Sequence, residues 1–221
     1  LAPQHHDDAY ARELDALAAT GEQASSALLA IALQAEGMPS VSYAGWQVPI
    51  RTDSAFTKAR IASIDDARVR ADLNAGKVVI ITGFQGVDPE GNITTLGRGG
   101  SDTSAVAVAA AMKAAECLIY TDVDGVYTTD PRVVPEARRL HTVSFEEMLE
   151  MASLGAKVMQ PNAVQASMLD NIPIYVRSTF SEKSGTKSLA LSTLSGYFIQ
   201  QHNERKTCKH QQKSNPKFKI K

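Results

Sequence analysis

Hydrophobic residues near the start of the chain are spaced as in amphipathic helices. Apolar residues three and four apart predict a helix over residues 7–19, with Leu14, Leu17 and Ala18 on one face. A second helix is expected over residues 20–37, because its first four residues, Thr-Gly-Glu-Gln, form a capping-box pattern and its last residue is a glycine. The sequence therefore predicts a helical start to the domain.

Shorter apolar runs farther along the chain predict strands. Residues 77–82 and 117–120 are apolar almost throughout, which is typical of strands covered on both faces in a parallel sheet. Residues 101–115 predict a helix that is apolar nearly all round and therefore buried. Further strands are expected over 39–43, 47–51, 60–64 and 172–176, further helices over 65–75, 144–153 and 157–170, and a hairpin turn over 88–92.

Strands and helices alternate through most of the chain, which predicts an α/β layered domain. The composition changes near Gly185. We therefore expect one domain over residues 1–186, followed by a basic and disordered tail over residues 187–221.

Charge divides the chain in the same way. Residues 1–186 carry 15 Lys and Arg against 23 Asp and Glu, whereas residues 187–221 carry 8 against 1. The basic tail has no interleaved aromatic residues or nucleic-acid-binding motif, so no nucleic-acid partner is expected. No apolar run approaches the roughly 20 residues of a membrane span, and none is expected. Two distant cysteines and the lack of an export signal favour a reducing cytoplasm.

The first candidate site is a glycine-rich segment, residues 97–102, which reads Gly-Arg-Gly-Gly-Ser-Asp and opens a buried helix. Glycines let backbone N–H groups approach a ligand, and a helix N-terminus favours an anion. The segment lacks the Gly-Lys-Ser/Thr ending of a P-loop and the third glycine of a dinucleotide fingerprint. Arg98 could hold a carboxylate through two hydrogen bonds, while Asp102 could orient a phosphate-binding lysine. A tight turn with an ordinary helix start is the alternative.

The second candidate site, residues 120–132, begins at the carboxyl end of a predicted strand, where ligands bind in open α/β sheets. Asp122 and Asp124 offer acceptors for ribose hydroxyls or an adenine amino group. Tyr127 offers an aromatic ring and Arg132 a phosphate-binding cation. A calcium loop is excluded, because the glycine comes too early and the last position is not a glutamate. A polar loop without a ligand is the alternative.

Together the two segments, GRGGSDTSA and TDVDGVYTTDPR, resemble the aspartate kinase branch of the amino-acid kinase family. The resemblance covers roughly residues 7–186 and implies a three-layer sandwich with a mainly parallel central sheet. Supporting matches are Gly-Glu-Gln at 21–23, Thr-Gly-Phe at 82–84, the helix at 144–153, Gly-Ala-Lys at 155–157 and Val-Arg-Ser at 176–178.

For the nucleotide, the resemblance implies an ATP site with Mg²⁺ bridging the phosphates. Thr121 and Asp122 would touch the base and the ribose. The segment from Tyr127 to Arg132 would wrap the nucleotide, with Arg132 near the phosphates, and Lys157 would complete the site.

For the second substrate, the resemblance implies L-aspartate, whose side-chain carboxylate accepts the γ-phosphoryl group of ATP. Glu22 would bind the amino group and Arg98 the carboxylate. Phe84 and Ser101 would line the pocket, and Asp102 would position a phosphate-binding lysine. The product would be 4-phospho-L-aspartate, at the entry to lysine, threonine and methionine biosynthesis.

Aspartate kinases begin with a strand that ends in Lys-Phe-Gly-Gly-Thr-Ser, and this sequence contains no such segment. We therefore expect the chain to start inside the kinase domain, to lack the regulatory domains, and to need a complementary N-terminal segment or a homo-oligomer. Two alternatives stay open. The chain could be a kinase for glutamate, acetylglutamate or a nucleoside monophosphate, or a nucleotide-binding fragment without activity.

Overall fold

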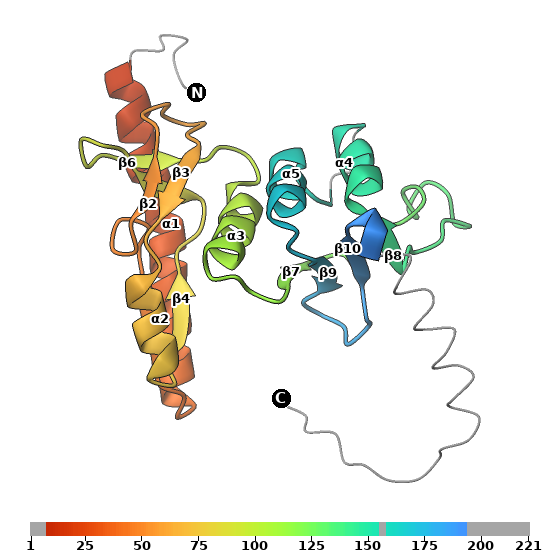
Figure 1. Ribbon diagram of the computed structural model, residues 1–221, viewed down its shortest axis with the longest axis horizontal. Helices are drawn as coiled ribbons and strands as arrows, with labels where there is room; N and C mark the ends of the chain where they lie inside the picture. Colours follow the sequence, from red (N-terminus) through yellow and green to blue (C-terminus); the bar gives the residue numbers. More distant parts are fainter. Residues whose placement is uncertain (1–7, 155–157, 194–221) are drawn as a thin grey trace.

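The computed structural model describes residues 8–154 and 158–193 (Figure 1). The first part of the chain contains α1 (Asp8–Ala35), β1 (Ser40–Tyr43), β2 (Ile50–Thr52), β3 (Ile61–Ile64), α2 (Ala67–Asn74), β4 (Val78–Ile81), β5 (Gln85–Val87) and β6 (Ile93–Thr95). The second part contains α3 (Gly100–Ala111), β7 (Cys117–Thr121), β8 (Thr142–Ser144), α4 (Phe145–Ser153), α5 (Pro161–Asp170), β9 (Ile174–Ser178) and β10 (Thr186–Leu189).

The described strands form three sheets. In the first part, β1 and β4 form a parallel pair, and a four-stranded sheet has the order β3-β2-β5-β6. In the second part, a four-stranded sheet has the order β7-β9-β10-β8, in which β7 and β9 run parallel and β9 and β10 antiparallel. Mixed sheets alternating with helices confirm the α/β class predicted from the sequence.

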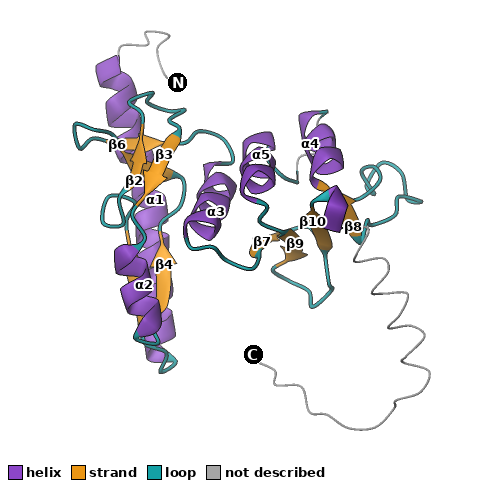
Figure 2. Cartoon of the chain, in the orientation of Figure 1, coloured by secondary structure: helices purple, strands orange, loops and turns teal. Residues whose placement is uncertain are grey.

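One helix layer covers the sheet of the second part. Helices α3, α5 and α4 stand side by side above strands β7 to β8 (Figure 2). Their apolar side chains meet those of the strands in one core that includes Val106, Ile119, Met148, Val164 and Val176. The other face of β7 is open, since Tyr120 is 57% exposed. The prediction that residues 117–120 are buried on both faces is therefore wrong.

Helix α1 runs without a break through the expected start of a second helix. The Thr20 hydroxyl does not cap a helix, because it donates to the Leu17 carbonyl at 2.7 Å, one turn earlier. Such back-bonding is how Thr and Ser satisfy their hydroxyls inside a helix. The predicted end is right, since Gly37 follows α1 with a φ of 79°.

The face of α1 that packs on the domain differs from the expected one. Leu14, Leu17 and Ala18 do share a face, but it is exposed, with Leu17 at 69%. Asp15 and Ala19 point inward instead, at 1% and 0% exposure, because α1 packs on β1, β4 and β6 through this side. The hydrophobic pattern alone therefore indicated the wrong face.

Within the described residues, α1 is also the one helix long and apolar enough to cross a membrane, over Tyr10–Ala35. Its most apolar window has a mean hydropathy of 1.3 and is 17% buried. The expectation that no stretch approaches this length is therefore wrong by that measure. Length and composition alone do not separate a spanning helix from a surface helix, and α1 carries Asp15 and Glu22 near its middle.

Two local predictions are confirmed by hydrogen bonds. Asp88 closes the β5–β6 hairpin, since its carboxylate accepts from the Asn92 backbone N–H at 2.7 Å. Ser144 and Glu147 form a reciprocal capping box at the start of α4, with distances of 3.1 and 2.9 Å. Side chains that bond their own backbone need no distant partner, which is why the sequence shows them clearly.

The expected boundary after Thr186 falls inside a strand. β10 starts at Thr186 and continues to Leu189, which is fully buried, and it pairs with both β8 and β9. The domain therefore extends at least through β10. Residues 194–221 of the expected tail lie outside the described residues.

Candidate functional site

The glycine-rich segment forms a tight connection between β6 and α3. Gly97 and Gly99 have φ values of 74° and 71°, a conformation that favours glycine. Neither has room for a side chain. A Cβ on Gly97 would lie 2.9 Å from the Thr57 carbonyl oxygen, and one on Gly99 would lie 1.8 Å from Cγ of Gln160. Between them, Arg98 is exposed.

Phe84 and Ser101 lie beside this connection. Phe84 has a φ of 69°, and its backbone N–H donates to the Ser104 hydroxyl at 2.9 Å. A Cβ on Gly100 would lie 2.8 Å from Cδ2 of Phe84. A Cβ on Gly83 would lie 3.7 Å from the Ser101 hydroxyl oxygen. The structure therefore brings Phe84 and Ser101 together with the glycine-rich connection, as their proposed roles require.

Helix α1 places Glu22 over the same segment. The neighbouring Gln23 donates from Nε2 to Oε1 of the fully buried Gln85 at 3.0 Å. One turn later, Ser26 accepts from the Thr82 hydroxyl at 3.1 Å. These two contacts hold the turn of α1 that carries Glu22 against residues 82–85, next to Phe84.

The charged side chains around the glycine-rich connection have no charged partners in the described part of the chain. Within residues 8–154 and 158–193, neither Arg98 nor Glu22 forms an ion pair or a side-chain hydrogen bond. The same holds for Asp102 in the first turn of α3, and burial raises the pKa of its carboxyl group above the usual range. A guanidinium and two carboxyl groups without partners are suited to a ligand that carries charges of both signs.

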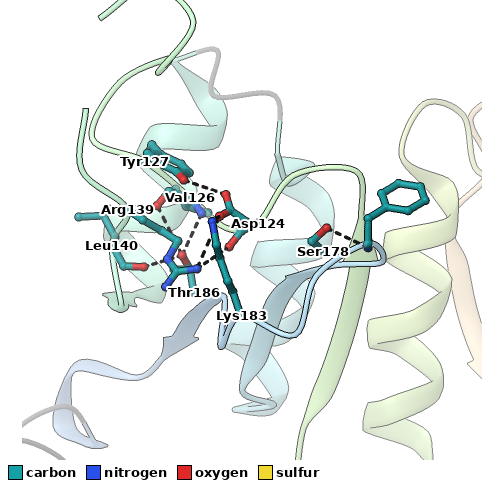
Figure 3. Close-up of polar contacts among 9 residues, drawn as sticks. Asp124, Val126, Tyr127, Arg139, Leu140, Ser178, Lys183 and Thr186 are labelled. Carbon is teal, nitrogen blue, oxygen red and sulfur yellow. Dashed lines mark hydrogen bonds and ion pairs between the residues drawn. The ribbon is translucent and has the colours of Figure 1, made fainter. Parts of the chain in front are cut away.

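The acidic segment after β7 is organised around Asp124 (Figure 3). Its carboxylate accepts from the Tyr127 hydroxyl and from Nζ of Lys183, each at 2.8 Å. Arg139 lies 3.8 Å from the same carboxylate and donates to the Asp124 carbonyl oxygen at 3.3 Å. The hydrogen bonds from Lys183 and Tyr127 lower the pKa of Asp124, and the Asp124 bond raises the pKa of Tyr127.

Thr186 at the start of β10 holds the base of this segment. Its hydroxyl accepts from the Val126 N–H at 2.8 Å and donates to the Leu140 carbonyl at 2.5 Å (Figure 3). Gly125 fits above it with a φ of 143°, where a Cβ would lie 2.7 Å from the Thr186 hydroxyl. The position of the acidic segment is therefore fixed from β10, about 60 residues farther along the chain.

The remaining predicted nucleotide ligands lie on the exposed side of this segment. The Thr121 hydroxyl donates to exposed Asp122 at 3.0 Å. Arg132 is 88% exposed and pairs with Asp130 at 2.8 Å, and this contact lowers the pKa of Asp130 to about 2. Asp122 is open to a ligand, whereas Asp124 is not, because its oxygens already bind Tyr127 and Lys183.

Sequence reasoning missed four residues of the site: Lys183, Arg139, Thr186 and Gln160. Each lies far along the chain from the residue it contacts, so no local spacing marks it. The predicted ATP ligand Lys157 lies outside the described residues. Gln160 follows it by three positions and packs on Gly99, which joins the α4–α5 connection to the glycine-rich connection.

The folded α/β layers and the two loops define a class of protein. The sequence profile of the amino acid kinase family matches residues 2–178, and the chain belongs to this family. Among curated relatives, it is 63% identical over 186 residues to an aspartokinase from Pseudomonas aeruginosa, covering 84% of this chain and 45% of the relative. It is 53% identical over 175 residues to an aspartokinase from Thermus thermophilus, covering 79% and 43%.

Solved structures agree with this assignment. Aspartokinase III from E. coli, in complex with aspartate and ADP, superposes with a TM-score of 0.76 at 35% identity, covering 81% of this chain and 41% of that chain. UMP kinase from Bacillus anthracis shares the fold at 20% identity and a TM-score of 0.58. The chain spans less than half the length of the curated relatives it matches.

Proposed function

We propose that this chain carries the nucleotide site and part of the amino-acid site of an aspartate kinase, which transfers the γ-phosphoryl group of ATP to the side-chain carboxylate of L-aspartate. The observation that carries the proposal is the pair of loops. One presents an arginine that has no partner within the described residues, beside glycines and a helix N-terminus, and the other presents open polar groups after β7. The similarity to aspartokinases, one of them described with aspartate and ADP, supports it.

The glycine-rich connection would hold the amino acid. Arg98 would bind a carboxylate of aspartate and Glu22 its ammonium group, while Phe84 and Ser101 would line the pocket. A guanidinium binds a carboxylate through two parallel hydrogen bonds, which orients the substrate as well as attracting it. The N-terminus of α3 would favour the negative charge of the transferring group.

The acidic segment would hold the nucleotide, with Thr121 and Asp122 at the base and ribose, and Tyr127 to Arg132 around it. Lys157, which lies outside the described residues, would complete the site. Arg132 would exchange its contact with Asp130 for the phosphates, which exposure of both side chains permits. Asp124 would act indirectly, because its contacts with Lys183 and Tyr127 shape the loop.

In the reaction, a carboxylate oxygen of aspartate would attack the γ-phosphorus in line with the departing ADP oxygen. The new O–P bond forms as the bond to the bridging oxygen breaks, so no covalent enzyme intermediate is required. Catalysis would rest on positioning and on charge stabilisation. Mg²⁺ would neutralise phosphate charge when bound. No cluster of three metal-binding side chains occurs among the described residues.

A second candidate function is nucleotide binding without phosphoryl transfer. Asp102 favours it, because this carboxyl group would orient a phosphate-binding lysine and has no cationic partner within the described residues. Loss of one group that stabilises the transition state commonly costs about 10²–10³ in rate.

Calorimetry and turnover on one preparation of the 221-residue chain separate these candidates. ADP titration measures nucleotide binding, and ADP release from ATP with aspartate, glutamate, acetylglutamate or UMP measures transfer. Aspartate-dependent release supports the proposed activity. Binding without release supports the second candidate, release with another substrate identifies a different kinase, and no ADP binding contradicts both.

A further inference from the structure

The most deeply buried carboxylate of the first part of the chain, Asp15 of α1, lies outside the groups considered so far. It is 1% exposed, and no cation pairs with it in the described part of the chain. Removing a carboxylate from water is unfavourable unless its oxygens are satisfied by donors. Its oxygens accept three hydrogen bonds, from the Thr57 N–H and the Thr95 N–H at 2.8 Å each and from the Thr95 hydroxyl at 2.7 Å.

These donors flank the base of the glycine-rich connection. Thr95 ends β6, two residues before Gly97, and its carbonyl accepts from the Ala59 N–H at 2.9 Å. Thr57 holds an unusual φ of 67°, and its carbonyl oxygen fills the place of a Gly97 side chain. Asp15 therefore bonds both segments that enclose Gly97.

Asp15 also sets the position of α1. Glu22 is seven residues away, two helical turns or about 10 Å along the axis on the same side of the helix. Between them, Ala19 is fully buried, and its carbonyl accepts from Nε2 of Gln85 at 3.1 Å. The helix can neither rotate nor slide without breaking the bonds at Asp15.

We propose that Asp15 is a positioning residue for the amino-acid site. It fixes the helix that carries Glu22 to the base of the connection that carries Arg98, and so sets the separation of the two charged groups. The inference rests on the proposed function for the identity of the ligand. The effect on the loop itself does not depend on that function.

A carboxylate is suited to this task because it only accepts hydrogen bonds, and all three neighbours donate. In Asp15→Asn the shape is kept but the negative charge is lost, and the NH₂ group faces the Thr95 hydroxyl, which must then accept instead of donate. Hydrogen bonds to a charged acceptor are roughly twice as strong as those to a neutral one, so all three contacts of Asp15 weaken. The segments around Gly97 should then loosen, while the loop after β7, held by Thr186, should not.

The decisive experiment is hydrogen exchange of the ligand-free chain, read by mass spectrometry. In Asp15→Asn, peptides covering residues 95–101 should exchange about tenfold faster or more, with residues 121–130 unchanged. Val69→Ala, a buried position in α2, serves as the control for general loss of stability. Exchange that rises evenly along the chain, or does not rise at 95–101, overturns the proposal.

Affinity provides the second measurement. Aspartate should bind Asp15→Asn about tenfold more weakly, with ADP affinity within about twofold of the unsubstituted chain. If Asp15→Asn does not fold, Thr95→Val removes only the hydroxyl donor. This variant should also bind aspartate more weakly with ADP affinity unchanged, but by a smaller factor than Asp15→Asn. Equal losses for both ligands would mean a purely structural role. If the unsubstituted chain binds no aspartate, the proposed function fails while the exchange result still decides the role of Asp15.

Discussion

The two loops of this kinase-family chain use their charged side chains in opposite ways. Around the glycine-rich connection, Arg98, Glu22 and Asp102 have no charged partners within the described residues. In the loop after β7, Asp124 binds Lys183 and Tyr127, and Asp130 binds Arg132. The first loop is held by backbone and buried polar groups, and the second by ion pairs, one of them with the distant Lys183.

This difference separates scaffold from ligand groups. A charge that is paired and shielded, such as Asp124, mainly sets the shape of a loop, whereas a charge without a partner, or an exposed one such as Arg132, is available to a ligand. Substitutions of Arg98 or Glu22 should therefore change binding and leave stability alone. Substitutions that support the second loop should change stability, or change nucleotide affinity through loop shape.

The largest expected effect is that of Gly185→Ala, beside the Thr186 anchor of the second loop. Gly185 has a φ of 75°, and a Cβ would lie 2.0 Å from the Val176 carbonyl oxygen. The backbone strain and the displaced strand together should cost about 3 kcal/mol or more of unfolding free energy. Urea unfolding measures it. Gly91→Ala has a similar φ but open space, and should cost only about 1 kcal/mol.

Arg98→Ala should have the next largest effect, on aspartate binding alone. Loss of a charge-assisted contact of about 1.5–3 kcal/mol corresponds to roughly 10- to 150-fold weaker binding. The thermal midpoint should not change, since Arg98 is exposed and has no partner in the described part of the chain. Arg60→Ala, at another exposed arginine, is the matched control. A fall in the thermal midpoint with unchanged aspartate affinity would mean that Arg98 stabilises the loop and does not bind aspartate.

Lys183→Met should weaken ADP binding several-fold without changing aspartate affinity, because Asp124 loses a partner that shapes the nucleotide loop. Lys113→Met, at an exposed lysine, is the control. The pKa of Asp124 is lowered, so its contribution is present above pH 3.8 and disappears as pH falls through the lowered value. ADP affinity of the unsubstituted chain should therefore fall in that acidic range. Equal ADP affinity in both variants would contradict the role of Lys183.

Asp102→Asn should have the smallest effect, a rise in the thermal midpoint at pH 7. Burial raises the pKa of Asp102, so ionisation costs stability as pH rises from 3.8 through the raised value. The gain should be at most about 2–4 °C, because the group is only half-buried and solvent screens it. Below pH 3 the two proteins should unfold alike. A lower midpoint at pH 7 would mean that an ionised Asp102 has a partner.

Local chemistry could be predicted from the sequence. The capping box at Ser144 and the turn at Asp88 involve neighbours within four residues, and both form as expected. The glycines at 97 and 99 also adopt the unusual φ that a tight connection needs. Each of these features depends on a few adjacent residues.

Features set by distant contacts could not be predicted. The buried face of α1 is chosen by Thr57 and Thr95, whose donors draw Asp15 inward although leucines lie on the opposite side. Likewise, Thr186 appeared to end the domain, because nothing near it in sequence marks its bond to Val126. A polar residue inside a fold satisfies partners that only the folded chain reveals.

The central claim is that the glycine-rich connection binds the amino acid and the loop after β7 binds the nucleotide. Hydrogen exchange with each ligand separately tests it most directly. Aspartate should slow exchange in residues 97–102, and ADP should slow it in residues 121–132, each leaving the other segment unchanged. Protection of 97–102 by ADP alone, or of neither segment by its ligand, would contradict the account.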